Sequence, residues 1–390
     1  MTTGEVRHTG KNTKVCFLAL GAYPLLTGGH STYVIGPQVL QALLATELAK
    51  RNIKVSVITF SDGGVPFEHV GGIEVIKTIP ENPHHSFARR VSSQIRLATS
   101  LWKALGRARA DVYFQQGGVL GVMGLFCRLR RKRFVVSVGS DAWVSSWGDW
   151  FKGKFKGFGF GLVGRFFYGL DIRLANVVIV MNESQRNLLK RNFHKDGVLI
   201  KHHVPITRKE RPEKTNPPVA IWVGTICEVK QPKLFLELAE AVPQARFQMI
   251  GGYFPSDKRL YDQIQESAQR MPNFDFLGVI PFDKINDYFS RAAILVNTSR
   301  VEAYPPFAFI QAWMNYTPVV SLHDNTEEIV SRHNLGFHSK TFEQLVQDTE
   351  TLLENEHLRK EMGENGRQYV EREHDINRIV ERYLEVFNRP

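Results

Sequence analysis

The sequence has few cysteines and no long apolar run. Its three cysteines, Cys16, Cys127 and Cys227, are widely spaced and form no CxxC pair, which argues against a disulfide framework and a cysteine zinc site. No stretch of about 18 apolar residues occurs, so we expect no membrane-spanning helix. The first 14 residues are polar and lack the apolar core of a signal peptide. These features predict a protein of the reducing cytosol.

Metal-ligand spacings and nucleic-acid motifs are missing as well. No His/Asp/Glu cluster has the spacing of a metal site, and no motif of a nucleic-acid-binding module occurs. The chain has 390 residues, more than one hydrophobic core usually holds, which favours two domains. Hydrophobic residues make up 43% and charged residues 23%, as is typical of a globular protein.

The positive charge is concentrated in one region. With 50 Lys/Arg and 39 Asp/Glu the formal net charge is +11. Residues 84–173 carry 16 Lys/Arg and 4 Asp/Glu, a local net of +12, so the rest of the chain sums to −1. This distribution excludes a uniformly basic, histone-like protein. It predicts one surface that meets an anionic partner.

The first half has an α/β pattern. Residues 15–20 form a short apolar run, a glycine loop with Gly28 and Gly29 follows, residues 38–51 have helical spacing, and residues 53–60 read as a strand. This β-loop-α-β unit predicts the start of a doubly wound parallel sheet. Further strands are expected at 111–114, 134–138 and 177–180.

The second half repeats the pattern after a polar, proline-rich linker at 206–218. Strands are expected at 219–223, 247–250, 274–277, 294–296 and 319–322, with a helix at 233–241 and charged helices within 341–387. The predicted organisation is an N-terminal domain at 14–205, a C-terminal domain at 219–372, and a helix at 373–390 that packs back on the N-terminal domain. Ligands of such sheets bind at the carboxyl ends of the strands, so an interdomain cleft is expected.

One motif places a lysine beside a glycine turn. The expected strand ends at Gly224, Thr225 begins a loop, and Lys230 stands just before the next helix. A glycine lets the backbone approach a ligand, a helix start favours negative charge, and Lys230 could add a point charge to a phosphate. The alternative is an ordinary β-α loop with a solvated lysine, which the residues alone favour over phosphate binding.

A second motif follows the strand at 294–296. Glu302 stands in a turn, two prolines come next, and a helical run begins near Phe307 and Ala308, with Gln311 inside it. Free backbone N–H groups at this helix start would suit a diphosphate, and Glu302 and Gln311 could bind hydroxyl groups. The alternative is that Glu302 is a loop carboxylate and Gln311 a buried amide.

Together these features resemble a known family, the retaining glycosyltransferases of family 4 with the GT-B fold. The resemblance covers residues 14–388. It is carried mainly by VGTICEVKQPKLFLELAEAVPQARFQMIGG, FLGVIPFDKINDYFSRAAILVNTS, EAYPPFAFIQAW and TPVVSL, which occur in the family's order and spacing. The resemblance implies two Rossmann-like domains, a nucleotide-diphosphate sugar of the UDP, GDP or ADP type as substrate, and no metal cofactor.

The resemblance also implies a donor site. The glycine loop approaches the donor diphosphate, Lys230 neutralises the leaving diphosphate, and Glu302 contacts the transferred sugar. The remaining donor-binding positions contribute backbone contacts to the phosphates and base or hold the ribose hydroxyls: Gly28, Gly29, Gly224, Thr225, Gly252, Val279, Phe307, Ala308 and Gln311.

Three positions depart from the family's pattern. Thr225 stands where many members have arginine, and Gln311 replaces a glutamate, which predicts a subgroup with Gln-Ala-Trp in place of Glu-Ala-Met. Val138 stands where many members have histidine, and the nearby Asp141 is the candidate to act there. Asp141 could instead be the N-cap of the next helix. The expected catalytic residues are therefore Lys230, Glu302 and Asp141. His202 and His203 are expected to be exposed loop residues.

The basic region combines cations with aromatic residues. We expect a membrane or acceptor patch made of Arg89, Arg90, Arg96, Trp102, Lys103, Arg131, Lys132, Lys152, Lys154 and Phe155. Such residues can bind anionic lipid headgroups, with a polyanionic or soluble acceptor as the alternative. Nucleic acid is not expected as a partner.

The predicted function is sugar transfer from a nucleotide-diphosphate donor to a lipid-linked or cell-surface polysaccharide acceptor, in the cytoplasm or at the cytosolic membrane face. Two alternatives stay open. One is a nucleotide-sugar epimerase on the same fold, and the other is a non-catalytic protein that binds nucleotides or polyanions.

Overall fold

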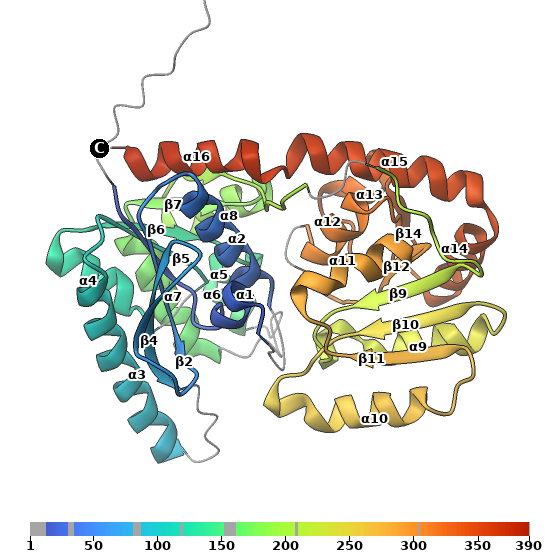
Figure 1. Cartoon of the computed structure of the whole chain (residues 1–390), viewed down its shortest axis with the longest axis horizontal. Coiled ribbons are helices and arrows are strands. Elements are labelled where there is room, and N and C mark those ends of the chain that lie inside the picture. Colours follow the sequence, from blue (N-terminus) through green and yellow to red (C-terminus); the bar gives the residue numbers. More distant parts are fainter. Residues whose placement is uncertain are drawn as a thin grey trace, which may run out of the picture.

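The computed structural model describes residues 13–29, 35–80, 87–117, 120–151, 161–206, 210–302 and 305–389, and of residues 87–91, 161, 162 and 326 it describes the backbone. Two α/β halves, each with its own sheet, lie side by side in Figure 1. The predicted fold class, two doubly wound α/β halves, is confirmed by this arrangement.

The N-terminal sheet has eight strands in the order β3-β4-β2-β1-β5-β6-β7-β8. Its strands are β1 (Val15–Leu18), β2 (Val55–Ser61), β3 (Phe67–Val70), β4 (Ile73–Pro80), β5 (Val112–Gln116), β6 (Arg133–Ser137), β7 (Val177–Val180) and β8 (Gly197–Leu199). The edge strand β3 runs antiparallel to β4, and the other neighbours are parallel. The accompanying helices are α1 (Tyr23–Thr27), α2 (Gly36–Lys50), α3 (Phe87–Ala108), α4 (Val122–Arg130), α5 (Asp141–Val144), α6 (Trp147–Phe151), α7 (Gly161–Leu174) and α8 (Glu183–Phe193).

The C-terminal sheet has six parallel strands in the order β11-β10-β9-β12-β13-β14. These are β9 (Val219–Val223), β10 (Arg246–Ile250), β11 (Phe274–Gly278), β12 (Ile294–Asn297), β13 (Val319–Ser321) and β14 (Gly336–His338). Its helical elements are η1 (Glu228–Lys230), α9 (Pro232–Ala241), η2 (Pro255–Asp257), α10 (Lys258–Ala268), α11 (Phe282–Arg291), α12 (Phe307–Met314), η3 (Thr326–Glu328), α13 (Ile329–Arg332), α14 (Phe342–Glu354), α15 (Glu356–Glu373) and α16 (Ile376–Asn388).

The last helix returns to the N-terminal half. Figure 1 shows α15 beside the C-terminal sheet and α16 running on along the N-terminal half. Tyr383 and Phe387 of α16 both meet Phe114 of β5 edge to face, with ring centroids 5.8 Å apart in each pair. These rings belong to the hydrophobic core that contains β1 and β2 of the N-terminal sheet. Because α16 follows α15 of the C-terminal half, its packing on this core connects the two halves.

The segment between the halves is tied to the C-terminal side. Lys214 Nζ donates to the backbone oxygen of Asn315 at 2.8 Å, and Thr215 N donates to Arg291 O at 3.0 Å. The expected boundaries at 14–205, 206–218, 219–372 and 373–390 stay predictions.

A carboxyl group is buried in the N-terminal core. The side chain of Asp171 on α7 accepts hydrogen bonds from Gln115 Nε2 at 2.8 Å and from Gly124 N at 3.2 Å. Burial penalises the charged carboxylate and raises the pKa of Asp171 to about 7, even though both hydrogen bonds act to lower it. In an unfolded chain the same carboxyl ionises near its ordinary pKa of 3.8. Keeping Asp171 in the core therefore costs stability that grows as pH rises from about 4 to about 7.

We expect Asp171→Asn to raise the melting temperature at pH 8 and to change it much less at pH 4. The asparagine amide cannot ionise, and it can donate to the buried Gln115 Oε1, which has no hydrogen-bond partner. Thermal unfolding at the two pH values measures the effect. The control is Asp196→Asn, because Asp196 is exposed. An equal gain at both pH values would contradict the ionisation argument.

Candidate functional site

The loop after β9 packs against the backbone of neighbouring loops. A Cβ on Gly251 would lie 1.8 Å from Gly224 O, so the turn after β10 can approach the turn after β9 only with glycine at position 251. Ile226 N donates to Gly252 O at 2.7 Å, which joins the same two turns. Thr225 lies between these contacts. The sequence-predicted residues Gly224, Thr225 and Gly252 are therefore neighbours in space.

A lysine and a glutamate form the centre of the site. Lys230 ends η1, and its Nζ lies 2.5 Å from each carboxylate oxygen of Glu302, which follows β12. Asn297 Nδ2 donates to Glu302 Oε1 at 3.0 Å. The Glu302 side chain is 7% exposed and that of Lys230 27% exposed. A ligand can thus reach the ammonium group more easily than the carboxylate.

Two further hydrogen bonds fix the loops that carry this pair. Thr298 Oγ1 donates to Lys230 O at 2.8 Å and accepts from the indole N–H of Trp222 at 3.0 Å. Arg300 N donates to Val229 O at 3.0 Å. Because Trp222 is buried in β9, these bonds tie the loop that carries Lys230 and the loop that carries Glu302 to the sheet.

Helix α12 begins beside this pair. Pro306 is the N-cap, and the first helical bond runs from Phe309 N to Pro306 O, so the N–H groups of Phe307 and Ala308 precede the helical hydrogen-bond series. Gln311 is buried, and its Nε2 donates to Asn286 Oδ1 on α11 at 3.4 Å. Residues 303 and 304 lie outside the described residues.

Val279 follows β11 and is 37% exposed. Gly278 before it has φ +65°, and a Cβ there would lie 3.0 Å from Tyr261 Oη, so this position favours glycine. Gly251 N donates to Gly278 O at 2.8 Å. Val279 therefore belongs to the same edge of the sheet as Gly224 and Gly252.

The N-terminal half contributes two predicted elements. Gly28, with φ +70°, ends α1, and Gly29 N donates to Pro24 O at 2.9 Å. Asp141 is the first residue of α5, and its Oδ2 accepts from Ser184 Oγ at 3.5 Å. The alternative role of Asp141 as N-cap is wrong, because Ser140 is the N-cap and its hydroxyl accepts from Ala142 N.

The expectation that His202 and His203 are exposed is wrong, since both are buried. His202 Nδ1 lies 3.0 Å from Pro305 O in the loop before α12, and His203 Nε2 lies 2.8 Å from Leu40 O on α2. His374 Nδ1 lies 2.8 Å from His202 O. Burial lowers the pKa of His202 to about 3 and those of His203 and His374 to about 4, so all three are neutral at pH 7.

Sequence reasoning missed these histidines as links between the halves. The apolar neighbours Ile200 and Val204, both buried, are a signal that could have predicted burial of the two histidines. No local pattern indicates the contact with Pro305, about 100 residues further along the chain. Within the described ranges, no group of three or more His, Cys, Asp or Glu is placed so that it could hold a metal ion.

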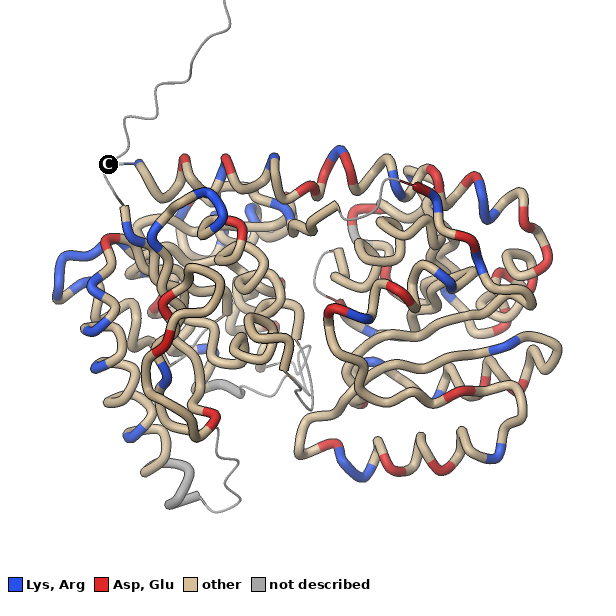
Figure 2. The backbone as a smooth tube through the Cα atoms, in the orientation of Figure 1, with Lys and Arg blue, Asp and Glu red and all other residues tan. Residues whose placement is uncertain are grey.

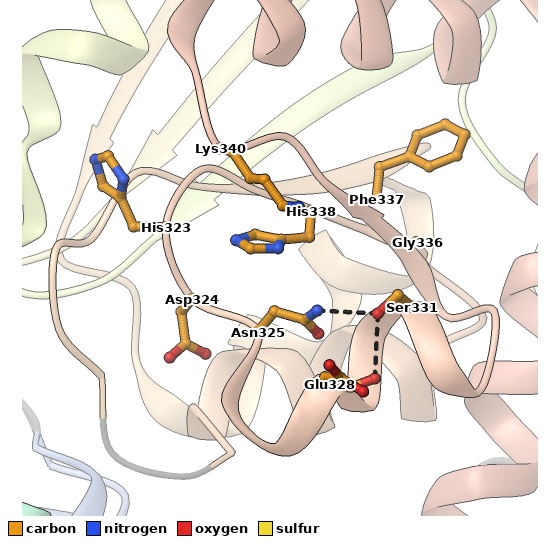
Figure 3. A pocket seen from close by; sticks show the side chains of 9 residues that line it. All are labelled: His323, Asp324, Asn325, Glu328, Ser331, Gly336, Phe337, His338 and Lys340. Carbon is orange, nitrogen blue, oxygen red and sulfur yellow. Dashed lines mark hydrogen bonds between the residues drawn. The ribbon is translucent and has the colours of Figure 1, made fainter.

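A cavity lined by described residues lies elsewhere. It has a volume of about 670 Å³ and is lined by the loop after β13 and by β14, with His323, Asn325, Glu328 and His338 among its residues (Figure 3). None of the sequence-predicted site residues lines it.

The predicted patch lies on the N-terminal half. Figure 2 shows blue segments for Lys and Arg gathered along α3 and α4. Arg96, Lys103 and Arg131 are exposed, and Lys132 pairs with Asp111 at 3.7 Å. Trp102 does not belong to an exposed aromatic surface, because it packs against the core with its ring centroid 5.2 Å from that of Phe126.

Part of the predicted patch is not described. Arg89 and Arg90 lie in α3, where the structure describes their backbone, and Lys152, Lys154 and Phe155 lie outside the described residues. The structure adds apolar residues that the sequence interpretation did not include. Ile95 on α3 is 60% exposed, and Leu125 and Leu129 on α4 are 41% and 70% exposed. In the part of the chain that the structure describes, no helix is long and apolar enough to cross a membrane.

Two family models match adjacent parts of the chain. Residues 36–205 match Glycosyltransferase Family 4, and residues 204–369 match Glycosyl transferases group 1. No curated protein matches the sequence. The chain is a glycosyltransferase, with an N-terminal half matched by family 4 and a C-terminal half matched by group 1.

Solved structures show the same fold. The chain is similar to sucrose-phosphate synthase from Thermosynechococcus elongatus, with 15% identity, a TM-score of 0.77, and coverage of 96% of this chain and 98% of that one. It is similar to Anabaena HepE in complex with UDP and glucose, with 14% identity, a TM-score of 0.71, and coverage of 96% and 99%. Trehalose-6-phosphate synthase OtsA has 9% identity, a TM-score of 0.73, and coverage of 97% and 99%. These likenesses confirm the GT-B fold.

Proposed function

We propose that this glycosyltransferase moves a sugar, with retention of anomeric configuration, from a nucleotide-diphosphate donor to a lipid-linked or cell-surface polysaccharide acceptor. The observation that carries the proposal is the Lys230–Glu302 pair at the carboxyl ends of β9 and β12. It combines a cation for a leaving diphosphate with a carboxylate for sugar hydroxyls. Ligands of parallel α/β sheets bind at this edge.

In the proposed reaction the anomeric C–O bond to the diphosphate breaks and the oxygen of an acceptor hydroxyl bonds to the anomeric carbon. The proton of that hydroxyl passes to the departing phosphate oxygen, and negative charge grows on the diphosphate as it leaves. Lys230 Nζ and the N–H groups of Phe307 and Ala308 stabilise that charge. Lys230 supplies the cation, and the reaction needs no metal ion. When the diphosphate binds Lys230, Glu302 exchanges part of its contact with the ammonium for the hydroxyl groups of the transferred sugar.

The other predicted residues complete the proposed donor site. Gly28 and Gly29 let the N-terminal half approach the diphosphate, and Gly224, Thr225 and Gly252 form the turns beneath it. The backbone at Val279 lies beside the base. The Gln311 amide, which donates to Asn286 in this structure, hydrogen-bonds to the ribose hydroxyls instead when the donor binds. Asp141, at the start of α5, takes the place of the family's histidine next to the acceptor. The Gln-Ala-Trp subgroup stays a prediction.

The donor is tested by ligand-induced stabilisation. HepE was solved with UDP and glucose and has the same fold, so we expect a UDP-sugar to raise the melting temperature more than the GDP- or ADP-sugar does. A ligand that binds only the folded state at 100 times its Kd stabilises it by about 2.7 kcal/mol. Thermal unfolding with UDP-, GDP- and ADP-glucose measures this. No shift with any of the three would contradict a nucleotide-sugar site.

We propose that the acceptor is reached at an anionic membrane surface on the cytosolic side. Support comes from α3 and α4, where the cations Arg96, Lys103 and Arg131 occur together with the exposed apolar residues Leu125 and Leu129. Cations attract anionic headgroups, and leucine side chains can enter the interface. The epimerase and the non-catalytic binding protein are not retained, because both family models describe glycosyl transfer.

A further inference from the structure

A carboxylate of the C-terminal half touches the N-terminal half. Glu327 lies in η3, in the loop that follows β13, and its Oε1 accepts the backbone N–H of Glu183 at 3.0 Å. Glu183 is the first residue of α8, the helix that follows β7. The hydrogen bond therefore joins a loop of the C-terminal half to a helix of the N-terminal half. It lies apart from the chain segment that connects the two halves covalently.

The start of α8 is suited to an incoming carboxylate. Its N-cap Asn182 accepts from Gln185 N at 2.7 Å, and Gln185 Oε1 accepts from Met181 N at 2.9 Å. These bonds are made within the N-terminal half, whereas the N–H of Glu183 donates to Glu327. The first N–H groups of a helix carry partial positive charge, so a carboxylate bonds there more strongly than a neutral acceptor does.

The backbone of η3 is held in an unusual conformation. Glu327 has φ +53° and Glu328 has φ +57°, a left-handed region that residues other than glycine seldom adopt. The loop is kept in this conformation by Asn325 and Ser331. Asn325 Oδ1 accepts from Val330 N at 3.0 Å and its Nδ2 donates to Ser331 Oγ at 2.9 Å, as Figure 3 shows for the second bond. Left-handed residues that the surrounding structure fixes in this way are concentrated at functional sites.

The same helix start contacts a predicted catalytic residue. Ser184, next to Glu183, donates its hydroxyl to Asp141 Oδ2 at 3.5 Å. The contact of Glu327 with Glu183 and the contact of Asp141 with Ser184 are therefore made by adjacent residues at the start of α8.

We propose that Glu327 is a positioning residue that holds the two halves together during sugar transfer by binding the N-terminus of α8. The proposal rests on the proposed function, because Asp141 and the donor residues must meet across the two halves. The hydrogen bond forms when the halves approach and breaks when they separate, and no covalent step is involved. Glu327 touches neither the sugar nor the diphosphate.

Small-angle scattering of the full chain tests the contact without any substrate. We expect Glu327→Ala to have a larger radius of gyration than the unaltered protein, because its halves separate more often. The matched control is Glu328→Ala. It also removes a carboxylate from a residue with nearly the same φ, but Glu328 pairs with Arg332 inside its own half and does not contact the N-terminal half through this ion pair. Glu327→Gln keeps an acceptor oxygen and should give an intermediate radius. Equal radii for all four proteins would overturn the proposal.

Kinetics provide the second readout. Loss of a hydrogen bond to a charged group typically weakens the state that contains it by a factor of about ten or more, so we expect Glu327→Ala to lower kcat/KM by about tenfold. Glu327→Gln should restore part of this loss, and Glu328→Ala should leave kcat/KM unchanged. Equal kcat/KM for the two alanine variants would also overturn the proposal. If no nucleotide sugar is turned over by the unaltered protein, the proposed function fails, while scattering still decides the role of Glu327.

Discussion

Lys230→Ala should lower the turnover of the nucleotide sugar at least about tenfold, with the larger part of the loss in kcat. The diphosphate of the bound donor already carries negative charge, and a further negative charge develops on it as the C–O bond breaks. The ammonium group therefore stabilises the transition state more than the bound donor. Removing one preorganised group that stabilises transition-state charge usually costs between about ten- and a thousandfold in rate. Release of nucleoside diphosphate from the donor found by thermal unfolding measures the effect.

The matched control for this prediction is Lys233→Ala. Lys233 is an exposed residue of α9, three positions from Lys230, so its loss changes the net charge equally but leaves the Lys230–Glu302 pair intact. We expect Lys233→Ala to keep the turnover of the unaltered protein. Equal activities of the two variants would remove Lys230 from the site. Glu302 would then be a structural carboxylate bonded to Asn297.

Reversing two charges on α3 should nearly abolish binding to anionic vesicles. Arg96 and Lys103 are exposed and seven residues apart, which places them on one face of the helix. Each cation near an anionic membrane surface contributes about 1 kcal/mol. The double variant Arg96→Glu/Lys103→Glu should therefore lower the fraction that co-sediments with vesicles well over tenfold, and added salt should weaken binding of the unaltered protein.

A charge-matched control is available on the other half. Lys258 is the first residue of α10, and Arg270 lies two residues beyond the end of this helix. Both are exposed, and Lys258→Glu/Arg270→Glu makes the same change in net charge. This variant should bind anionic vesicles nearly as the unaltered protein does. Equal loss in both variants would indicate a general effect of net charge, and binding to neutral vesicles would contradict an electrostatic surface.

The sequence predicts most of the buried strands because their apolar runs are short and clearly bounded. The strand expected at 219–223 corresponds to β9 residue for residue, and those expected at 247–250 and 294–296 differ from β10 and β12 by one residue. The inner strand β4 and the edge strands β3 and β14 were not predicted. Residues of β3 are half exposed and include Glu68 and His69, so their pattern does not differ from that of a loop.

The site was predictable where a motif is local and unpredictable where it depends on distant contacts. Lys230 and Glu302 were singled out from separate motifs, and the structure brings them to 2.5 Å. The bond of Glu327 to the start of α8 joins positions 144 residues apart, and nothing in the local sequence indicates it. For the same reason Trp102 was predicted to be a surface aromatic, although its ring packs nearly perpendicular to that of Phe126 on α4.

Titration calorimetry of UDP with the unaltered protein, Lys230→Ala and Lys233→Ala tests most directly whether the Lys230–Glu302 pair is the diphosphate site. We expect saturable binding of UDP to the unaltered protein and to Lys233→Ala, with affinity at least about tenfold weaker in Lys230→Ala because a charge-assisted contact to phosphate is lost. Equal affinity of all three proteins for UDP would contradict a diphosphate site at this pair.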